Sequence, residues 1–251
     1  MSAKTMINIW APGLEAGNIG ATILIIFALV FISNRFKVLD KNGVIAAAVL
    51  GLGVGILGHW TWLIILLSFL GSSHKATKWR FDEKTKLGLC ESEDGHRGWT
   101  NVVANGGLPG IVALLSYISG DHANGFWMFT AAVAVAAADT FASEIGCLDN
   151  RVRMITTMKP CKAGTNGGFS PNGQLAAAIG AICVAVMAMM VEPNLMYATA
   201  AAIIGWFGCQ VDSLLGALFE NRGYMTKDSV NFSAISFGII AMWWYLGMPL
   251  L

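Results

Sequence analysis

Long apolar runs are the feature that most restricts how this chain can fold. Hydrophobic residues make up 55% of the sequence and charged residues only 12%, against roughly 25% charged in a soluble domain. Several runs reach or approach the ~20 residues that cross a hydrocarbon core. The eight runs are residues 19–32, 44–57, 60–70, 102–118, 126–138, 175–191, 196–211 and 232–246. We therefore predict a single all-α integral membrane domain, residues 1–251, with about eight transmembrane helices.

The basic residues predict how these helices are oriented. Fifteen of the 16 lysines and arginines fall into alternate connections between the runs. Basic loops of membrane proteins face the cytoplasm. We expect both termini on the non-cytoplasmic side of a multi-pass protein, in a prokaryotic plasma membrane. The five cysteines form no C-x-x-C pair, so we expect free thiols and no zinc site.

Three carboxylates stand near the cytoplasmic ends of two apolar runs. Asp139 and Glu144 end the alanine-rich stretch AVAVAAADTFASEIG, and Asp212 lies in CQVDSLLGALFEN, next to Ser213. Carboxylates inside a membrane are costly and usually mark ion, proton or substrate sites. We predict that all three are catalytic and bind a metal ion, and that Ser213 contacts the substrate.

Polar residues also open the helices that begin on the same side. Arg97 precedes one such helix, whose first turns carry Asn101 and Asn105, and Asn231 lies in the first turn of another. We predict that Arg97 grips a phosphate group and that the three asparagines contact the substrate. Arginine could instead be a topology anchor, and asparagines between membrane helices often hydrogen-bond only to each other.

The chemistry of these groups favours Mg²⁺, because carboxylates without histidine or cysteine suit a hard cation that completes its shell with phosphates. A glycine-rich segment at 159–173, KPCKAGTNGGFSPNG, could supply the phosphate site. Ser170 before Pro171 is typical of a helix N-cap, which would direct a helix N-terminus at the same place. No Walker A motif is present. The predicted phosphate-binding residues are Lys159, Lys162, Gly164, Thr165, Asn166, Gly167, Gly168 and Ser170.

Five stretches carry a family resemblance. They are GHRGWTNVVANGGLPG at 95–110, ADTFASEIG at 138–146, ITTMKPCKAGTNGGFSPNG at 155–173, VDSLLGA at 211–217 and DSVNF at 228–232. The chain resembles the membrane family of plastid phytyl-phosphate kinases with its animal, bacterial and archaeal relatives. That family is distantly similar to polyprenol kinases and CDP-diacylglycerol synthases. Asn166 stands where relatives commonly carry aspartate, and Lys162 where they are often apolar.

The resemblance implies a phosphoryl transfer at the cytoplasmic membrane face. The donor would be a nucleoside triphosphate, with CTP favoured, and the acceptor an isoprenyl monophosphate such as phytyl or geranylgeranyl phosphate. Two alternatives remain, a cytidylyltransferase that forms a CDP-lipid and a transporter of isoprenoid or lipid phosphates. We expect no nucleic-acid partner and leave a homo-oligomer open.

Overall fold

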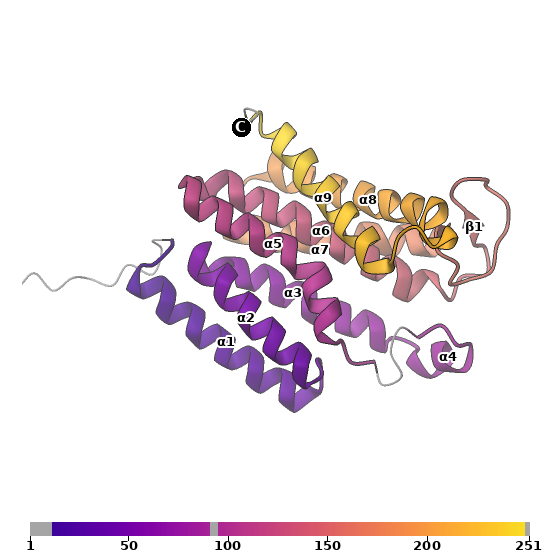
Figure 1. Ribbon diagram of the computed structural model, residues 1–251, viewed down its shortest axis with the longest axis horizontal. Helices are drawn as coiled ribbons and strands as arrows, with labels where there is room; N and C mark the ends of the chain where they lie inside the picture. The colour runs from indigo at the N-terminus through magenta and orange to yellow at the C-terminus, as the bar shows by residue number, and fades with distance from the viewer. Residues whose placement is uncertain (1–11, 91–94, 249–251) are drawn as a thin grey trace, which may run out of the picture.

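The computed structural model describes residues 12–90 and 95–248, and it is mostly helical. In this part of the chain the eight apolar runs form helices of 17 to 25 residues (Figure 1), and the last run ends one residue beyond its helix, at the C-cap Leu246. These helices are α1 (Ala16–Phe36), α2 (Lys41–Leu57), α3 (Trp60–Lys78), α5 (Trp99–Ser119), α6 (His122–Gly146), α7 (Pro171–Val191), α8 (Leu195–Leu218) and α9 (Lys227–Tyr245). The shorter elements are α4 (Phe81–Lys86), the 3₁₀ turn η1 (Glu220–Arg222), and strands β1 (Arg153–Met154) and β2 (Gly168–Phe169), which pair antiparallel.

Five of the long helical segments in the described residues are long and apolar enough to cross a membrane. They are α1, α5, α6, α7 and the helical segment Leu195–Arg222, while α2 is apolar but shorter. The prediction of a helical membrane domain is therefore confirmed. The count of eight spans and the placement of both termini stay predictions.

The connections predicted to be basic lie together at one end of the helix bundle. Figure 1 shows α4, the β1 hairpin and the turn between α8 and α9 at the right, whereas α1 begins and α9 ends at the left. We call the right-hand end the basic end. Its described connecting segments are residues 37–40, 79–90, 95–98, 147–170 and 219–226.

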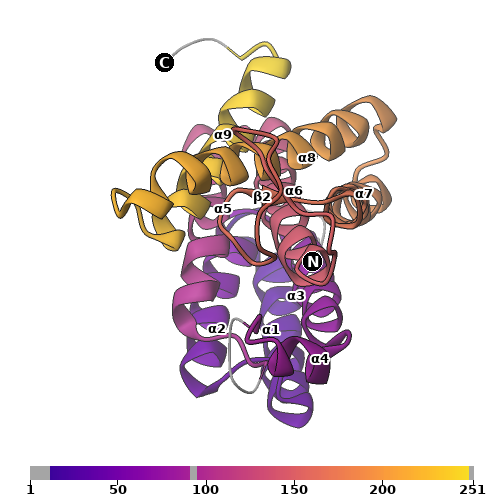
Figure 2. The same cartoon turned by 90° about the vertical axis from the view of Figure 1, so that its right-hand side faces the viewer.

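Helix α6 forms the centre of the bundle. Helices α3, α5, α7, α8 and α9 all pack on it, as Figure 2 shows from the basic end, and residues 131–138 are at most 2% exposed. Small residues allow this close approach. A Cβ added at Gly180 of α7 would lie 2.7 Å from the carbonyl oxygen of Ala137. The alanine-rich composition of α6 is thus explained by packing, and beyond Asp139 the helix stays packed at Thr140 and Phe141.

A second group of helices, α1, α2, α3 and α5, stands beside this core (Figure 1). Its basic end is held by a backbone bridge between Leu39 and Arg97. The amide of Asp40 donates to the carbonyl oxygen of Arg97 at 3.2 Å, and the Asp40 side chain caps α2 by accepting from the amide of Gly43 at 2.6 Å. These contacts place Arg97 between the starts of α2 and α5.

Candidate active site at the basic end

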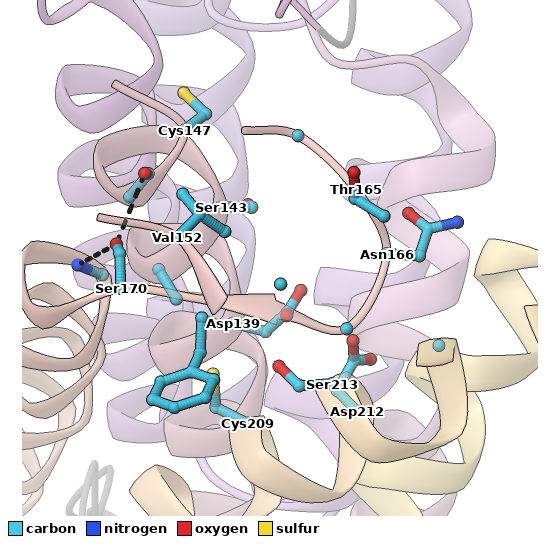
Figure 3. Close-up of a pocket in the computed structure, with 18 of the residues that line it drawn as sticks. Asp139, Ser143, Cys147, Val152, Thr165, Asn166, Ser170, Cys209, Asp212 and Ser213 are labelled. Atoms are coloured by element: carbon cyan, nitrogen blue, oxygen red, sulfur yellow. Dashed lines mark hydrogen bonds between the residues drawn. The ribbon is translucent and has the colours of Figure 1, made fainter. Parts of the chain in front are cut away.

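A polar cavity of about 240 Å³ opens at the basic end. Its walls come from the last turns of α6, the second half of α8, the start of α7 and the glycine-rich loop (Figure 3). The wall residues that sequence reasoning selected are Asp139, Glu144, Gly164, Thr165, Asn166, Gly167, Gly168, Ser170, Asp212 and Ser213. Segments more than 70 residues apart in the sequence, such as those of Asp139 and Asp212, therefore meet at one place, as the predicted topology required.

Asp139 of α6 and Asp212 of α8 form a carboxyl pair in this cavity. Their side chains converge in Figure 3, and the charge of Asp139 acts on Asp212. Oδ2 of Asp212 is buried and has no hydrogen-bond partner among the described residues. Two neighbouring carboxylates repel each other unless a proton or a cation lies between them. The pair therefore offers oxygen ligands to a cation.

A second acceptor oxygen on the cavity wall is also unsatisfied. Gln174, in the first turn of α7, donates from Nε2 to Oε1 of Gln210 at 3.1 Å, and Gln210 in turn donates to the carbonyl oxygen of Trp206 at 3.1 Å. Oε1 of Gln174 is left without a partner among the described residues. Because both orphaned groups are acceptors, the cavity is suited to a ligand that brings positive charge or hydrogen-bond donors.

Glu144 does not join the carboxyl pair, which corrects our expectation of three metal-binding carboxylates. Its Oε2 contacts Nζ of Lys84 at 2.6 Å, and its Oε1 accepts from Oγ1 of Thr77 at 2.7 Å. Within the described residues no group of three or more His, Cys, Asp and Glu side chains is arranged to hold a metal ion. A lysine already neutralises Glu144, so a metal has no electrostatic role there.

Lys84 is fully buried although it lies in the most basic loop of the chain. Besides Glu144, its ammonium donates to the carbonyl oxygens of Thr77 at 2.7 Å and Ala76 at 3.3 Å. Three acceptors satisfy the three N–H groups of a lysine. The short helix α4 is thereby fastened to the ends of α3 and α6.

The glycine-rich loop rests on α8 through two glycines. Gly167 has φ of +78°, and a Cβ at this position would lie 2.7 Å from the carbonyl oxygen of Ser213. A Cβ at Gly216 of α8 would lie 3.3 Å from the amide nitrogen of Gly167. Asn221 adds a hydrogen bond of 2.9 Å to the carbonyl oxygen of Asn166. The sequence predicts that Gly167 helps to bind a phosphate, and the structure shows that Gly167 and Gly216 let the loop lie close against α8.

The lysines of this loop are not on the cavity wall, which corrects another expectation. Lys159 and Lys162 are exposed to solvent and line no part of the cavity. The wall instead carries Lys227, the first residue of α9, whose charge acts on Asp212. Lys227 had been assigned to topology alone. Its position after the seventh run could not show that it faces the carboxyl pair.

The N-terminus of α7 begins at Ser170 as predicted, but its amides are already used. Oγ of Ser170 accepts from the amide of Gly173 at 3.1 Å, and Oδ2 of Asp149 accepts from the amide of Asn172 at 3.1 Å. Hydrogen bonds from Arg151 hold the pKa of Asp149 well below its usual range. An internal carboxylate thus occupies the anion site of this helix, and we no longer expect the helix amides to bind phosphate directly.

The remaining predicted residues lie elsewhere. Arg97 donates to Oδ1 of Asn101 at 3.3 Å and to Oγ1 of Thr77 at 3.4 Å, and Asn105 donates to the carbonyl oxygen of Asn101 at 2.9 Å. These three residues line a separate apolar groove. Asn231 is buried in α9 and lies on neither wall. Its interpretation as an internal helix residue therefore fits better than substrate contact.

Comparison with known proteins places the chain in a family. Residues 24–238 match the model of the family described as integral membrane protein DUF92. The chain belongs to this family. It is a multi-pass integral membrane protein, and the resemblance drawn from its five motifs is confirmed.

Relatives of the chain come from an archaeon and from plants. An uncharacterised membrane protein of Methanocaldococcus jannaschii is 31% identical over 218 residues, which cover 86% of this chain and 90% of the relative. Protein PGR of Arabidopsis thaliana is 28% identical, over 80% of this chain and 79% of the relative. The chloroplastic protein VTE6 of the same plant is 27% identical, over 80% and 63%. No solved structure matches the chain.

Proposed function

We propose that the chain is a membrane phosphotransferase that uses a nucleoside triphosphate, with CTP favoured, to convert an isoprenyl monophosphate into its diphosphate. The observation that carries the proposal is the Asp139–Asp212 pair, with an orphaned acceptor oxygen, at the wall of a polar cavity. The family resemblance supports the same chemistry, since it includes plastid phytyl-phosphate kinases.

The residues of the cavity fit Mg²⁺. This ion typically takes one or two protein carboxylates and completes its shell with water and substrate phosphates, and Asp139 and Asp212 would hold it. When bound, Mg²⁺ would neutralise the charge of the triphosphate and of the transferred group. Lys227 adds a positive charge on the same wall.

The phosphoryl transfer does not require the protein to form a covalent intermediate. An oxygen of the acceptor monophosphate attacks the γ-phosphorus of the donor. A new P–O bond forms as the bond from the γ-phosphorus to the β–γ bridging oxygen breaks, and the nucleoside diphosphate leaves. The acceptor is already anionic near neutral pH, so no general base is needed, and catalysis rests on positioning and charge neutralisation. A cavity with carboxylates, a lysine and a glycine-rich loop, and without a histidine on its wall, suits that demand.

Product analysis tests the proposal. Purified protein in lipid nanodiscs is incubated with geranylgeranyl phosphate, Mg²⁺ and each nucleoside triphosphate in turn, labelled at the γ-phosphate or in the base. We expect γ-label in an isoprenyl diphosphate, and none with the Asp212→Asn variant. Base label in the lipid would instead indicate a cytidylyltransferase. Absence of any lipid product, with the lipid bound, would favour a transporter and overturn the proposal.

A further inference from the structure

An apolar groove lies outside the polar cavity, among α1, α2, α3 and α5, with a volume of about 80 Å³. Among the residues that the structure describes, its lining is almost entirely aliphatic and aromatic, with polar side chains from Arg97, Asn101 and Asn105. The main apolar lining residues are Ile25, Leu29, Leu50, Leu63, Leu67 and Leu70. The groove therefore combines an apolar length with one cationic end.

The polar residues of the groove are confined to the basic end of the bundle. Arg97 precedes α5, and Asn101 and Asn105 lie in its first two turns. Along α3 the lining extends from Leu63 to Leu70, which is about 10 Å at the rise of an α-helix. That depth is roughly a third of a ~30 Å hydrocarbon core. An amphiphile bound in the groove would thus place its hydrocarbon tail at the depth of the membrane core and its polar head at the basic end.

Thr77 connects this polar end to the cavity. Its hydroxyl donates to Oε1 of Glu144 at 2.7 Å and lies 3.4 Å from Nη2 of Arg97, while Glu144 lines the polar cavity. The guanidinium of Arg97 is therefore two hydrogen bonds from the cavity wall. A phosphate held at the end of the groove would stand next to the site that receives the nucleotide.

From this juxtaposition we infer that the groove binds the phosphate-proximal part of the hydrocarbon chain of the acceptor, with the acceptor phosphate at Arg97. The inference rests on the proposed function and names the site of its lipid substrate. A single-chain amphiphile with an anionic head matches the groove in charge and polarity. The chain beyond the groove would continue among the membrane lipids.

Two variants of α2 separate the groove from the outer helix surface. Ala47 lines the groove, so Ala47→Phe fills it, whereas Val49 is 67% exposed on the outside of the same helix, so Val49→Phe is the matched control. Leu67→Trp fills the groove from α3 and guards against a folding defect peculiar to Ala47→Phe. Elution as a single peak in size exclusion confirms that each variant is folded.

The probe is geranylgeranyl phosphate that carries a diazirine near the head end of its chain. After irradiation in nanodiscs, mass spectrometry locates the label. We expect labelled groove residues on α2, α3 and α5, competition by unlabelled geranylgeranyl phosphate, and at least an about tenfold loss of labelling in Ala47→Phe, which corresponds to excluding roughly two methylenes. Val49→Phe should label normally.

Two results would overturn the inference. One is label on outward-facing residues only, and the other is equal labelling by the matching geranylgeraniol probe, which would indicate membrane lipid in the groove. Failure of the kinase proposal looks different. Groove labelling without any diphosphate product would remove the kinase and keep the groove, whereas normal product formation by Ala47→Phe would remove the groove and keep the kinase.

Discussion

Two buried carboxylate sites line the same cavity, and they differ in what neutralises them. Glu144 has Lys84 at 2.6 Å and Thr77 at 2.7 Å, whereas Asp212 is paired with another acid and keeps an oxygen without a hydrogen-bond partner among the described residues. A buried charge must be paired or must bind a cation. The first site is therefore complete within the chain, whereas at the second Lys227 supplies a charge from the same wall and Oδ2 of Asp212 stays available to a ligand.

The largest effect on turnover is expected at the Asp139–Asp212 pair. Asp139→Asn or Asp212→Asn keeps the size of the side chain and removes the charge that would hold Mg²⁺. We expect turnover to fall by about a hundredfold to a thousandfold, the loss typical of a principal electrostatic group. Diphosphate formation in nanodiscs measures it, and Glu192→Gln, an exposed carboxylate at the opposite end, is the control.

Thermal stability distinguishes this effect from unfolding. Because like charges are relieved in Asp212→Asn, its melting temperature should stay near or above that of the parent protein. A variant that melts early, or one that turns over normally, would contradict the role of the pair as a cation site.

The Lys84–Glu144 pair should show the opposite pattern, with a large effect on stability. Lys84→Met leaves Glu144 buried without its cation, and breaking a buried ion pair by removing one partner costs about 3–5 kcal/mol. We expect a large fall in stability, measured by thermal denaturation in detergent, with Lys86→Met on the exposed face of α4 as the control. The double variant Lys84→Met, Glu144→Gln should recover much of the loss. Without that recovery, packing of Lys84 would matter more than its charge.

The contrast between these sites also marks how far the sequence could predict the molecule. Hydropathy and helix caps are local, so the helices, the Ser170 cap and the meeting of Asp139, Asp212 and the glycine-rich loop were predictable. The pairing of Lys84 with Glu144 was not, because 60 residues separate them and Lys84 is one of six basic residues in its loop.

The same limit explains the other corrections. Lys159 and Lys162 carried the right charge in the right loop, but only tertiary structure shows that both turn to solvent while Lys227 faces the cavity. Asp149 was overlooked because an aspartate in a polar loop is ordinarily solvated. Its capture of the α7 N-terminus depends on a contact across 23 residues.

A smaller effect is expected at Arg97, at the polar end of the groove. Arg97→Lys keeps the charge and loses the planar fork that can bind a phosphate through two hydrogen bonds. We expect kcat/KM for the acceptor to fall about tenfold, the value of roughly 1–3 kcal/mol for a lost charged hydrogen bond, with the nucleotide KM unchanged. Arg35→Lys on an exposed turn is the control. Unchanged kinetics in Arg97→Lys would mean that this residue serves only as a topology anchor.

Lys227 should affect the other substrate. Its position beside Asp212 predicts that Lys227→Ala raises the KM for the nucleotide by roughly threefold to tenfold, as for one partly exposed charge contact, and leaves the acceptor KM unchanged. Lys159→Ala, at an exposed lysine of the glycine-rich segment that does not line the cavity, should change neither constant. The reverse pattern, with Lys159 sensitive and Lys227 silent, would mean that the loop turns its lysines inward when the nucleotide binds.

The smallest effect is expected at Asp149, a buried carboxylate that is paired with Arg151. Arg151 lowers the pKa of Asp149 in the folded protein below the ~3.9 of an unfolded aspartate. A lowered folded pKa stabilises the native state above the unfolded pKa, and this contribution is lost as the pH falls through the folded pKa. Near neutral pH the cap of α7 should therefore be pH-independent, and it should weaken only below about pH 4.

Hydrogen exchange at the amide of Asn172, which donates to Asp149, measures this cap. Asp149→Asn should lower protection there by roughly threefold to tenfold near neutral pH, as for one net hydrogen bond, and should remove the acid dependence. Asp82→Asn, exposed on α4, controls for the change in charge. If nucleotide binding restores full protection in Asp149→Asn, the amides of α7 are open to phosphate after all, and the carboxylate of Asp149 is a stand-in for the ligand.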